Sequence, residues 1–162
     1  MSQLRLQIAG PSQAESIVGF VNESSRSRFL HGGYSMDMDQ FVTLSKKGKF
    51  LVVEKDGTLA GCIYVEPNAG TSLLDYLVVN SHMRRSGIGS QLLQAGEELC
   101  QNAKARFIHV QVVNLNCEVV KFWYRRGYVE FDELPCQCES RSSLRCSILK
   151  MAKHMDRICP GF

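Results

Sequence analysis

The stretch that decides the fold spans residues 77–93 and reads LVVNSHMRRSGIGSQLL. It begins as an apolar strand, passes through a loop that contains Gly87 and Gly89, and continues directly into a helical pattern. The first N–H groups of a helix have no partner within the helix, and the helix dipole places partial positive charge there. Glycine lets the backbone approach an anion closely, and Arg84 and Arg85 add formal positive charge. The stretch therefore predicts a site for phosphate or pyrophosphate.

Two other phosphate-binding loops and a simple turn compete with this interpretation. A P-loop needs Gly-Lys-Ser/Thr after its glycines, and residues 84–90 contain no lysine. A dinucleotide-binding fold needs three spaced glycines early in a run of parallel strands, whereas here a hairpin precedes the loop. On the glycines alone, a strand-to-helix turn with two solvated arginines stays open.

On the N-terminal side of this loop, the pattern first predicts a strand and a helix. Residues 4–8 alternate with period two, as a strand does. Ser12 as N-cap and Glu15 three residues later have the form of a capping box, which opens a helix that ends near Ser24. We expect a loop over residues 25–36.

A second helix and a three-stranded meander follow. Asp37 or Asp39 can cap a helix that ends near Lys46. The pair Asp56-Gly57 between two apolar runs is a strong hairpin signal. The antiparallel strands of the meander are expected at residues 50–54, 59–65 and 72–79.

On the C-terminal side, the pattern predicts a parallel crossover and two closing strands. The remaining elements are helices at 88–103 and 117–126 and strands at 107–113, 128–131 and 144–151. The strand that ends at Val79, the helix after it and the next strand form a βαβ unit. We expect one α+β domain over residues 1–162, with a mixed, mostly antiparallel sheet of six to seven strands, a central βαβ unit and about four helices.

Composition excludes several classes of protein. Hydrophobic residues at 44% and charged residues at 22% are ordinary for a globular domain, and argue against disorder, collagen and coiled coil. No apolar run approaches the roughly 20 residues of a membrane span, and the N-terminus lacks a signal pattern. Seven cysteines without a regular framework favour a reduced protein, so we expect a cytoplasmic location, with the nucleus left open.

The positive charge is concentrated in the middle of the chain. Residues 80–126 carry seven basic against three acidic side chains, whereas the flanking parts are nearly balanced. This favours a small polyanionic ligand. A net charge of +3 is too small to imply nucleic acid, and the spacing Cys136-Gln137-Cys138 does not fit a zinc site, so we expect neither nucleic acid nor metal.

The spacing Arg84-x-x-Gly87-x-Gly89 resembles the Gln/Arg-x-x-Gly-x-Gly/Ala signature of the GNAT superfamily of N-acetyltransferases, and Ile88 fits its usual Gly-Ile-Gly form. The expected order of strands and helices resembles that family over roughly residues 3–152. The resemblance implies an N-acetyltransferase that moves an acetyl group from acetyl-CoA to a primary amine by direct transfer through a tetrahedral intermediate.

The resemblance also implies where the cofactor binds. In that family the strand corresponding to 72–79 splays from its parallel neighbour, here 107–113, and its backbone pairs with the pantetheine arm. Asn116 lies where the family often has an asparagine that contacts the cofactor, and residues 122–128 resemble its Phe/Leu-Tyr-x-x-x-Gly-Phe/Tyr segment. The implied cofactor-binding residues are Leu77, Val78, Val79, Arg84, Arg85, Ser86, Gly87, Ile88, Gly89, Ser90, Asn116 and Trp123.

The proton-transfer residues depart from the family pattern. Trp123 occupies the position of the family's tyrosine acid, and an indole cannot protonate a thiolate. The adjacent Tyr124 is the candidate acid. The alternatives are a shifted helix, water as the proton donor, or a packing role for this tyrosine. The resemblance points to the Val79 amide as the donor to the oxyanion.

The candidate base is Asp75. The family's usual glutamate falls at Leu73, which is apolar, and Asp75 two residues later faces the same side of the strand. An aspartate in an apolar strand is expensive to bury. It acts as a base, binds the substrate ammonium or takes backbone hydrogen bonds. A lone histidine in a strand, such as His109, more often packs.

The acceptor and the partners are less defined. Residues 25–48 are the family's variable region, which usually lines the acceptor site. Its side chains suited to a cationic amine are His31, Tyr34, Asp37 and Asp39, although both aspartates can simply cap a helix. We expect a small-molecule or protein primary amine as acceptor, and residues 125–128 are a candidate homodimer face. The alternative is a catalytically degenerate acetyl-CoA or CoA-binding module that acts as a sensor or scaffold.

Overall fold

The computed structural model describes residues 3–28, 35–83, 85–114, 117–135 and 147–155. Its strands are β1 (Leu4–Ile8), β2 (Lys49–Lys55), β3 (Thr58–Glu66), β4 (Gly70–Val79), β5 (Ala105–Val113), β6 (Val129–Pro135) and β7 (Ser147–His154). Its helices are α1 (Ala14–Arg28), α2 (Met38–Lys47), α3 (Ile88–Asn102) and α4 (Cys117–Arg125), with short 3-10 turns at Pro11–Gln13 and Ser81–Met83. None of these described helices is long and apolar enough to cross a membrane.

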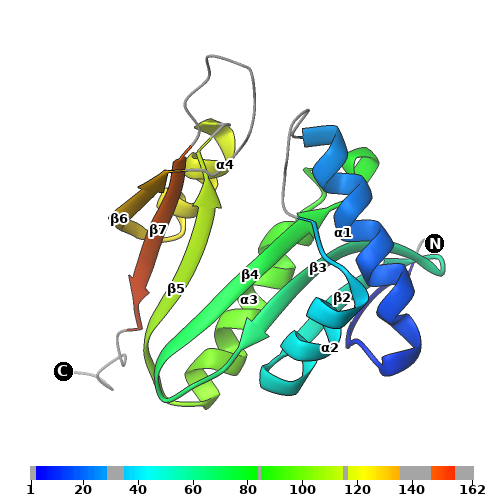
Figure 1. Cartoon of the computed structure of the whole chain (residues 1–162), viewed down its shortest axis with the longest axis horizontal. Helices are drawn as coiled ribbons and strands as arrows, with labels where there is room; N and C mark the ends of the chain where they lie inside the picture. Colours follow the sequence, from blue (N-terminus) through cyan, green and yellow to red (C-terminus); the bar gives the residue numbers. More distant parts are fainter. Residues whose placement is uncertain (1–2, 29–34, 84, 115–116, 136–146, 156–162) are drawn as a thin grey trace.

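The strands described form one seven-stranded sheet in the order β1-β2-β3-β4-β5-β7-β6 (Figure 1). Neighbouring strands are antiparallel, except that β4 and β5 are parallel and joined through α3. This arrangement confirms the expected α+β fold, with its mostly antiparallel sheet and its central βαβ unit.

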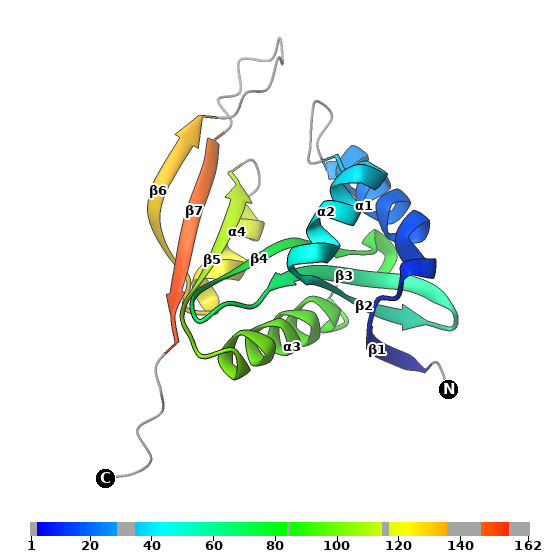
Figure 2. The same cartoon turned by 60° about the horizontal axis from the view of Figure 1, so that its bottom comes forward.

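Helices lie on both faces of the sheet, and each face has its own apolar cluster. Figure 2 shows α1 and α2 on one side of β2 to β4 and α3 on the other. Ile17 and Phe41 of α1 and α2 pack with Phe50 of β2, whereas Leu92 of α3 packs with Ile108 of β5. Burial of these two faces stabilises the fold because it removes apolar surface from water.

The hairpin between β2 and β3 has the turn that its sequence predicts. Asp56 and Gly57 have φ angles of 51° and 80°. Positive φ at both central residues is the type I′ geometry, whose twist matches that of the flanking strands. The hairpin prediction is therefore confirmed.

The start of the first helix differs from its prediction. Pro11–Gln13 form a 3-10 turn and α1 begins at Ala14, so the expected capping box of Ser12 and Glu15 is wrong. Instead the Gln13 side chain accepts the Gly10 N–H at 3.1 Å and donates to Glu54 of β2 at 2.9 Å. This glutamine reaches both partners because the tight turn brings it over the sheet. The helix then runs to Arg28, past the expected end at Ser24, because no glycine or proline interrupts it there.

The cap of the second helix is settled between the two candidates. The Asp37 side chain accepts the Gln40 N–H at 2.7 Å, and the Gln40 side chain accepts the Asp37 N–H at 2.9 Å. This reciprocal capping box makes Asp37 the N-cap of α2. Asp39 lies exposed in the first turn, where its charge suits the helix dipole.

Gly48, which ends α2, supplies a test of the packing between α2 and β3. A Cβ there would lie 2.3 Å from the Val65 carbonyl oxygen and 2.7 Å from the Tyr64 hydroxyl. Its φ of −149° is available to alanine, so the conflict is purely steric. We expect Gly48→Ala to lower the free energy of unfolding by about 1–3 kcal/mol in urea denaturation.

Gly19→Ala is the matched control for this variant. Gly19 is exposed within α1, and a Cβ there meets nothing within 4 Å. The same substitution should stabilise the protein by about 0.5–1 kcal/mol, because alanine favours a helix interior. Equal urea midpoints for the two variants would contradict the packing described at Gly48.

Candidate functional site

The parallel strands β4 and β5 diverge toward the end of β4. Their pairing begins at Gly70 and ends at Leu74, which lies opposite Val110. Beyond this point β4 stays paired with β3 up to Val79, and β5 stays paired with β7 up to Val113. Each strand thus keeps its outer neighbour while the two inner edges separate (Figure 1). We call these unpaired edges, residues 75–79 and 111–113, the β4–β5 opening.

The end of β4 directs backbone groups into this opening. The Asn80 N–H donates to the Ala60 carbonyl of β3 at 2.8 Å. Because successive residues of a strand direct their backbone groups to opposite edges, Leu77 and Val79 point away from β3, whereas Val78 points toward it. Leu77 and Val79 therefore offer unpaired N–H and C=O groups at the opening, as the cofactor hypothesis requires of them.

The loop after β4 leads into α3 through a left-handed glycine. Gly87 is the N-cap of α3 with φ of 83°, a conformation that glycine adopts readily. The first helical bond runs from the Gln91 N–H to the Gly87 carbonyl at 2.9 Å. The N–H groups of Ile88, Gly89 and Ser90 precede that bond and have no partner within the helix. They form the end of α3 that is suited to an anion, and we call residues 88–90 the α3 first turn.

The surroundings of the α3 first turn fit a phosphate ligand. Arg85 is exposed, and a Cβ at Gly87 would meet nothing within 4 Å, so the approach is open. Ile88 is only 2% exposed and anchors the turn in the core. The Ser86 hydroxyl donates to the Met83 carbonyl, which fixes the loop itself. Arg84 and Asn116, two of the expected cofactor-binding residues, lie outside the described residues.

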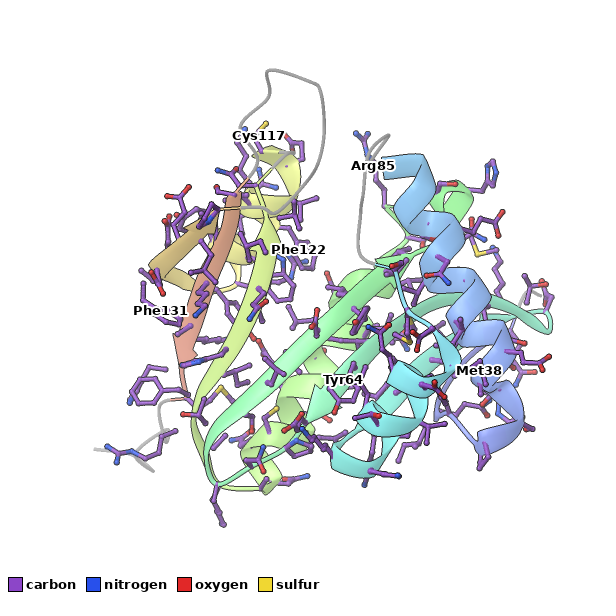
Figure 3. The ribbon with its side chains drawn as sticks, in the orientation of Figure 1. Met38, Tyr64, Arg85, Cys117, Phe122 and Phe131 are labelled. Atoms are coloured by element: carbon purple, nitrogen blue, oxygen red, sulfur yellow. The ribbon has the colours of Figure 1, made fainter. Side chains whose placement is uncertain are left out.

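The α3 first turn lies beside both β4 and α4. A Cβ at Gly89 would be 3.5 Å from a Val79 side-chain carbon and 3.8 Å from the ring of Phe122. Figure 3 shows Phe122 on the β5 side of the opening and Arg85 across from it. The helix end, the end of β4 and the aromatic ring therefore surround one region.

Arg126 is a further cation beside this region. The sequence analysis did not assign this arginine to the site. Its guanidinium donates to the Ser90 hydroxyl and to the Phe122 carbonyl, the latter at 3.1 Å. The same group lies over the Phe122 ring, 3.5 Å from its centroid. The signal available in the sequence was the spacing of four between Phe122 and Arg126, which places both on one side of a helical turn.

Trp123 has a packing role. It is 6% exposed, and its ring meets those of Phe122 and Tyr128 edge-on, with centroids 5.4 and 5.0 Å away. These contacts join α4 to the start of β6. A contact of Trp123 with the cofactor stays a prediction.

Tyr124 points away from the β4–β5 opening. Its hydroxyl lies 3.4 Å from the Glu130 carboxylate on β6, which stands two places beyond β5 in the sheet. Phe122, two residues earlier, faces the α3 first turn, and two residues correspond to about 200° of helical rotation. The hypothesis that Tyr124 is the general acid therefore lacks geometric support, and we do not retain it.

Asp75 lies where β4 and β5 separate. It is the first residue of β4 after the last pair with β5, and it pairs with Tyr64 of β3. Tyr64 belongs to the cluster under α1 and α2, so Asp75 faces that side of the sheet. Tyr76 has φ of 50° and forms a bulge here, and its N–H donates to the Asp75 carboxylate at 2.7 Å.

The surroundings of Asp75 make its carboxyl weakly acidic. Burial raises the pKa of Asp75 to about 6, and the hydrogen bond from the Tyr76 N–H lowers it in part. The bulge supplies one hydrogen bond to the carboxylate, which is the structural role expected of it. A carboxyl with a raised pKa at the separation of two strands is also suited to proton transfer.

The other candidates on this side have mixed outcomes. His109 pairs with Leu73, and its ring lies 4.9 Å from that of Phe131, so its observed contact is packing. Asp37 caps α2, as described above, and His31 and Tyr34 lie outside the described residues. In the part of the chain that the structure describes, no three His, Cys, Asp or Glu side chains gather as metal ligands would.

Comparison with known proteins agrees with this geometry. A model of the acetyltransferase (GNAT) family matches residues 15–128. The protein YdhI of Bacillus subtilis (strain 168), described as uncharacterized, is 27% identical over 106 residues. That match covers 65% of this chain and 64% of YdhI, so the chain spans less than two thirds of this relative.

Solved structures of similar fold include two whose names bear on this site. The ribosomal-protein-S18-alanine N-acetyltransferase from Escherichia coli superposes with a TM-score of 0.78 at 12% identity, covering 99% of this chain and 100% of that one. The protein yncA from Salmonella typhimurium, solved with its cofactor acetyl-CoA, has a TM-score of 0.75 at 12% identity and 96% coverage of both chains. At these identities the likeness shows the fold.

Proposed function

Because the chain belongs to the acetyltransferase (GNAT) family, we propose that it transfers the acetyl group of acetyl-CoA to a primary amine. The family match supports an acetyltransferase in general. The observation that carries the finer proposal is the β4–β5 opening beside the α3 first turn. Unpaired backbone groups of Leu77 and Val79 there lie next to unpaired helix N–H groups and the exposed Arg85.

Different backbone N–H groups of the chain would bind different parts of the cofactor. When bound, acetyl-CoA supplies an acetyl thioester, which is activated toward amines. The N–H groups of Ile88, Gly89 and Ser90 would hold its pyrophosphate, as unsatisfied helix N–H groups do for anions. The Val79 N–H, which faces the opening, is the proposed donor to the acyl oxygen as negative charge develops there.

Asp75 is the proposed general base. An ammonium group has no lone pair, so the acceptor must lose a proton before its nitrogen attacks the acyl carbon. A carboxyl with a pKa of about 6 is ionised at pH 8 and can take that proton. The nitrogen would then add to the acyl carbon to give the tetrahedral intermediate. This intermediate would collapse as the C–S bond breaks and the sulfur keeps its electron pair, while the second proton of the nitrogen passes to water. Because Tyr124 points away from the β4–β5 opening, we propose that water protonates the thiolate.

The acceptor is proposed to be a small molecule or a protein with a cationic amine. Asp75 faces the α1 and α2 side of the sheet, and its carboxylate attracts an ammonium group. The anion-binding end of α3 packs on the opposite face. We therefore propose that cofactor phosphates and acceptor approach from opposite faces of the sheet and meet between the strands.

Two departures from the family pattern favour a second candidate function. Trp123 is buried at the position of the usual tyrosine, and Leu73 occupies that of the usual glutamate. A chain that binds acetyl-CoA without turnover, as a sensor or scaffold, has the same cofactor site. Among the described residues, Asp75 on the acceptor side is the candidate that distinguishes the enzyme from this module.

Cofactor binding can be tested first and turnover second. We expect acetyl-CoA at about a hundred times its Kd to stabilise the protein by about 2.7 kcal/mol. For a chain of this size the melting temperature should rise by roughly 5–10 °C in differential scanning fluorimetry. No shift at saturating cofactor would rule out both functions.

A panel of small amines and peptide N-termini then separates the two functions. Free thiol release above the rate without amine identifies the enzyme and its acceptor class. A melting shift without thiol release from any amine would favour the sensor or scaffold.

A further inference from the structure

Arg126 is held in one place beside the α3 first turn. It donates to the Ser90 hydroxyl and the Phe122 carbonyl, and it stacks on the Phe122 ring at 3.5 Å. Ser90 is the third residue of α3, so the guanidinium lies at the helix end whose N–H groups are unsatisfied. Phe122 itself lies beside this turn, since a Cβ at Gly89 would be 3.8 Å from its ring. An ordered cation therefore stands next to the anion-binding groups.

The Arg126 guanidinium is in no salt bridge among the described residues, although Glu97 acts on it electrostatically. Burial lowers the pKa of Arg126, the Glu97 carboxylate raises it, and the neighbouring Arg125 lowers it to a smaller extent. Arginine carries five N–H donors, and the two bonds described leave others for a ligand. A partly buried cation of this kind is stabilised when an anion binds.

We propose that Arg126 binds a phosphate group of coenzyme A and fixes the nucleotide end of the cofactor against the α3 first turn. The proposal rests on the proposed function, because it takes cofactor binding as its premise. The planar fork of a guanidinium matches phosphate oxygens, and such charge-assisted bonds are stronger than neutral ones. The phosphate belongs either to the pyrophosphate or to the 3′-phosphate of the ribose. Phe122 is the positioning residue that holds the fork by stacking.

The structural alternative is that Arg126 only joins α4 to α3 through Ser90. Arg126→Gln and Arg125→Gln separate these roles, because both remove one positive charge at neighbouring positions and Arg125 is exposed. By isothermal titration with CoA we expect Arg126→Gln to bind about tenfold more weakly or worse. Arg125→Gln should stay within about threefold of the wild type. Arg126→Lys, which keeps the charge but loses the fork, should fall between them.

Truncated ligands identify the group that Arg126 contacts. Pantetheine lacks every phosphate, so its affinity should be the same for Arg126→Gln and wild type. Loss of the effect with 3′-dephospho-CoA would assign the contact to the 3′-phosphate, and persistence would assign it to the pyrophosphate. Circular dichroism checks that each variant is folded, and Arg126→Lys replaces Arg126→Gln if the latter is not.

Three results would overturn the proposal. They are an unchanged CoA affinity in the Arg126 variants, an equal loss in Arg125→Gln, and an equal loss for pantetheine, which would mark a purely structural role. A wild-type protein that does not bind CoA instead overturns the proposed function, and this is seen before any variant is compared.

Discussion

Gly87→Glu is expected to bind acetyl-CoA at least a hundredfold more weakly than the wild-type chain, at ordinary ionic strength. A carboxylate at this position would stand beside the site proposed for the pyrophosphate. Two like charges about 4 Å apart repel by roughly 1–4 kcal/mol, depending on how far water screens them, and each 1.4 kcal/mol is tenfold in affinity. The added side chain also occupies the open approach to the helix N–H groups. Isothermal titration with acetyl-CoA measures the loss.

Gly87→Ala separates the charge from the backbone strain. At φ of 83° any side chain is strained, so both variants should lose about 1–2 kcal/mol of unfolding free energy. The Cβ of alanine meets nothing within 4 Å, and cofactor binding should therefore stay within about tenfold. If Gly87→Glu binds like Gly87→Ala, the phosphate does not lie at this helix end.

Local patterns were sufficient to predict the order of strands and helices. Asp56-Gly57 predicted the hairpin because a type I′ turn needs two residues that tolerate positive φ. The glycine at position 87 predicted the start of α3 for a similar reason. The start of α1 was predicted wrongly because a side chain there bonds to a residue distant in the sequence. Gln13 donates a hydrogen bond to Glu54. Strand ends also shifted, and β6 continues to Pro135 beyond the expected end at residue 131.

The site was only partly predictable because three of its features depend on the three-dimensional structure. The bulge at Tyr76 places both Asp75 and Tyr76 on the face of α1 and α2, and an alternation rule cannot foresee such an insertion. The direction of Tyr124 depends on helical phase, since one residue corresponds to about 100°. In the sequence, Arg126 is one of several basic residues. Its location at the α3 first turn follows only from the contact of α4 with Ser90 of α3. Backbone chemistry was thus easier to predict than side-chain chemistry.

The raised pKa of Asp75 has a consequence for stability. A carboxyl whose folded pKa of about 6 exceeds its unfolded value near 4 binds more protons in the native state between those values. Its contribution to stability is therefore present at pH 4 and lost as the pH rises through about 6. Asp75→Asn should stabilise the protein by about 2 kcal/mol at pH 8 and by little at pH 4, measured as urea midpoints. An equal difference at both pH values would contradict burial as the cause of the shift.

The same variant is expected to lose acetyl transfer. If Asp75 removes the acceptor proton, Asp75→Asn should lower kcat by about 10²–10⁴-fold while CoA binding is unchanged. Asp132→Asn, an exposed aspartate paired with Lys150 on the far strands, is the matched control and should keep wild-type rates.

The pH profile then shows whether the lost activity belongs to a titrating base. For the wild type, kcat/KM should rise with pH through an apparent pKa near 6, where Asp75 ionises, and the acceptor amine adds its own limb at higher pH. Asp75→Asn cannot titrate, so the lower limb should disappear while the upper one remains. Persistence of the lower limb in the variant would assign it to another group. The role of Asp75 would then be to bind the acceptor ammonium or to accept the Tyr76 N–H hydrogen bond.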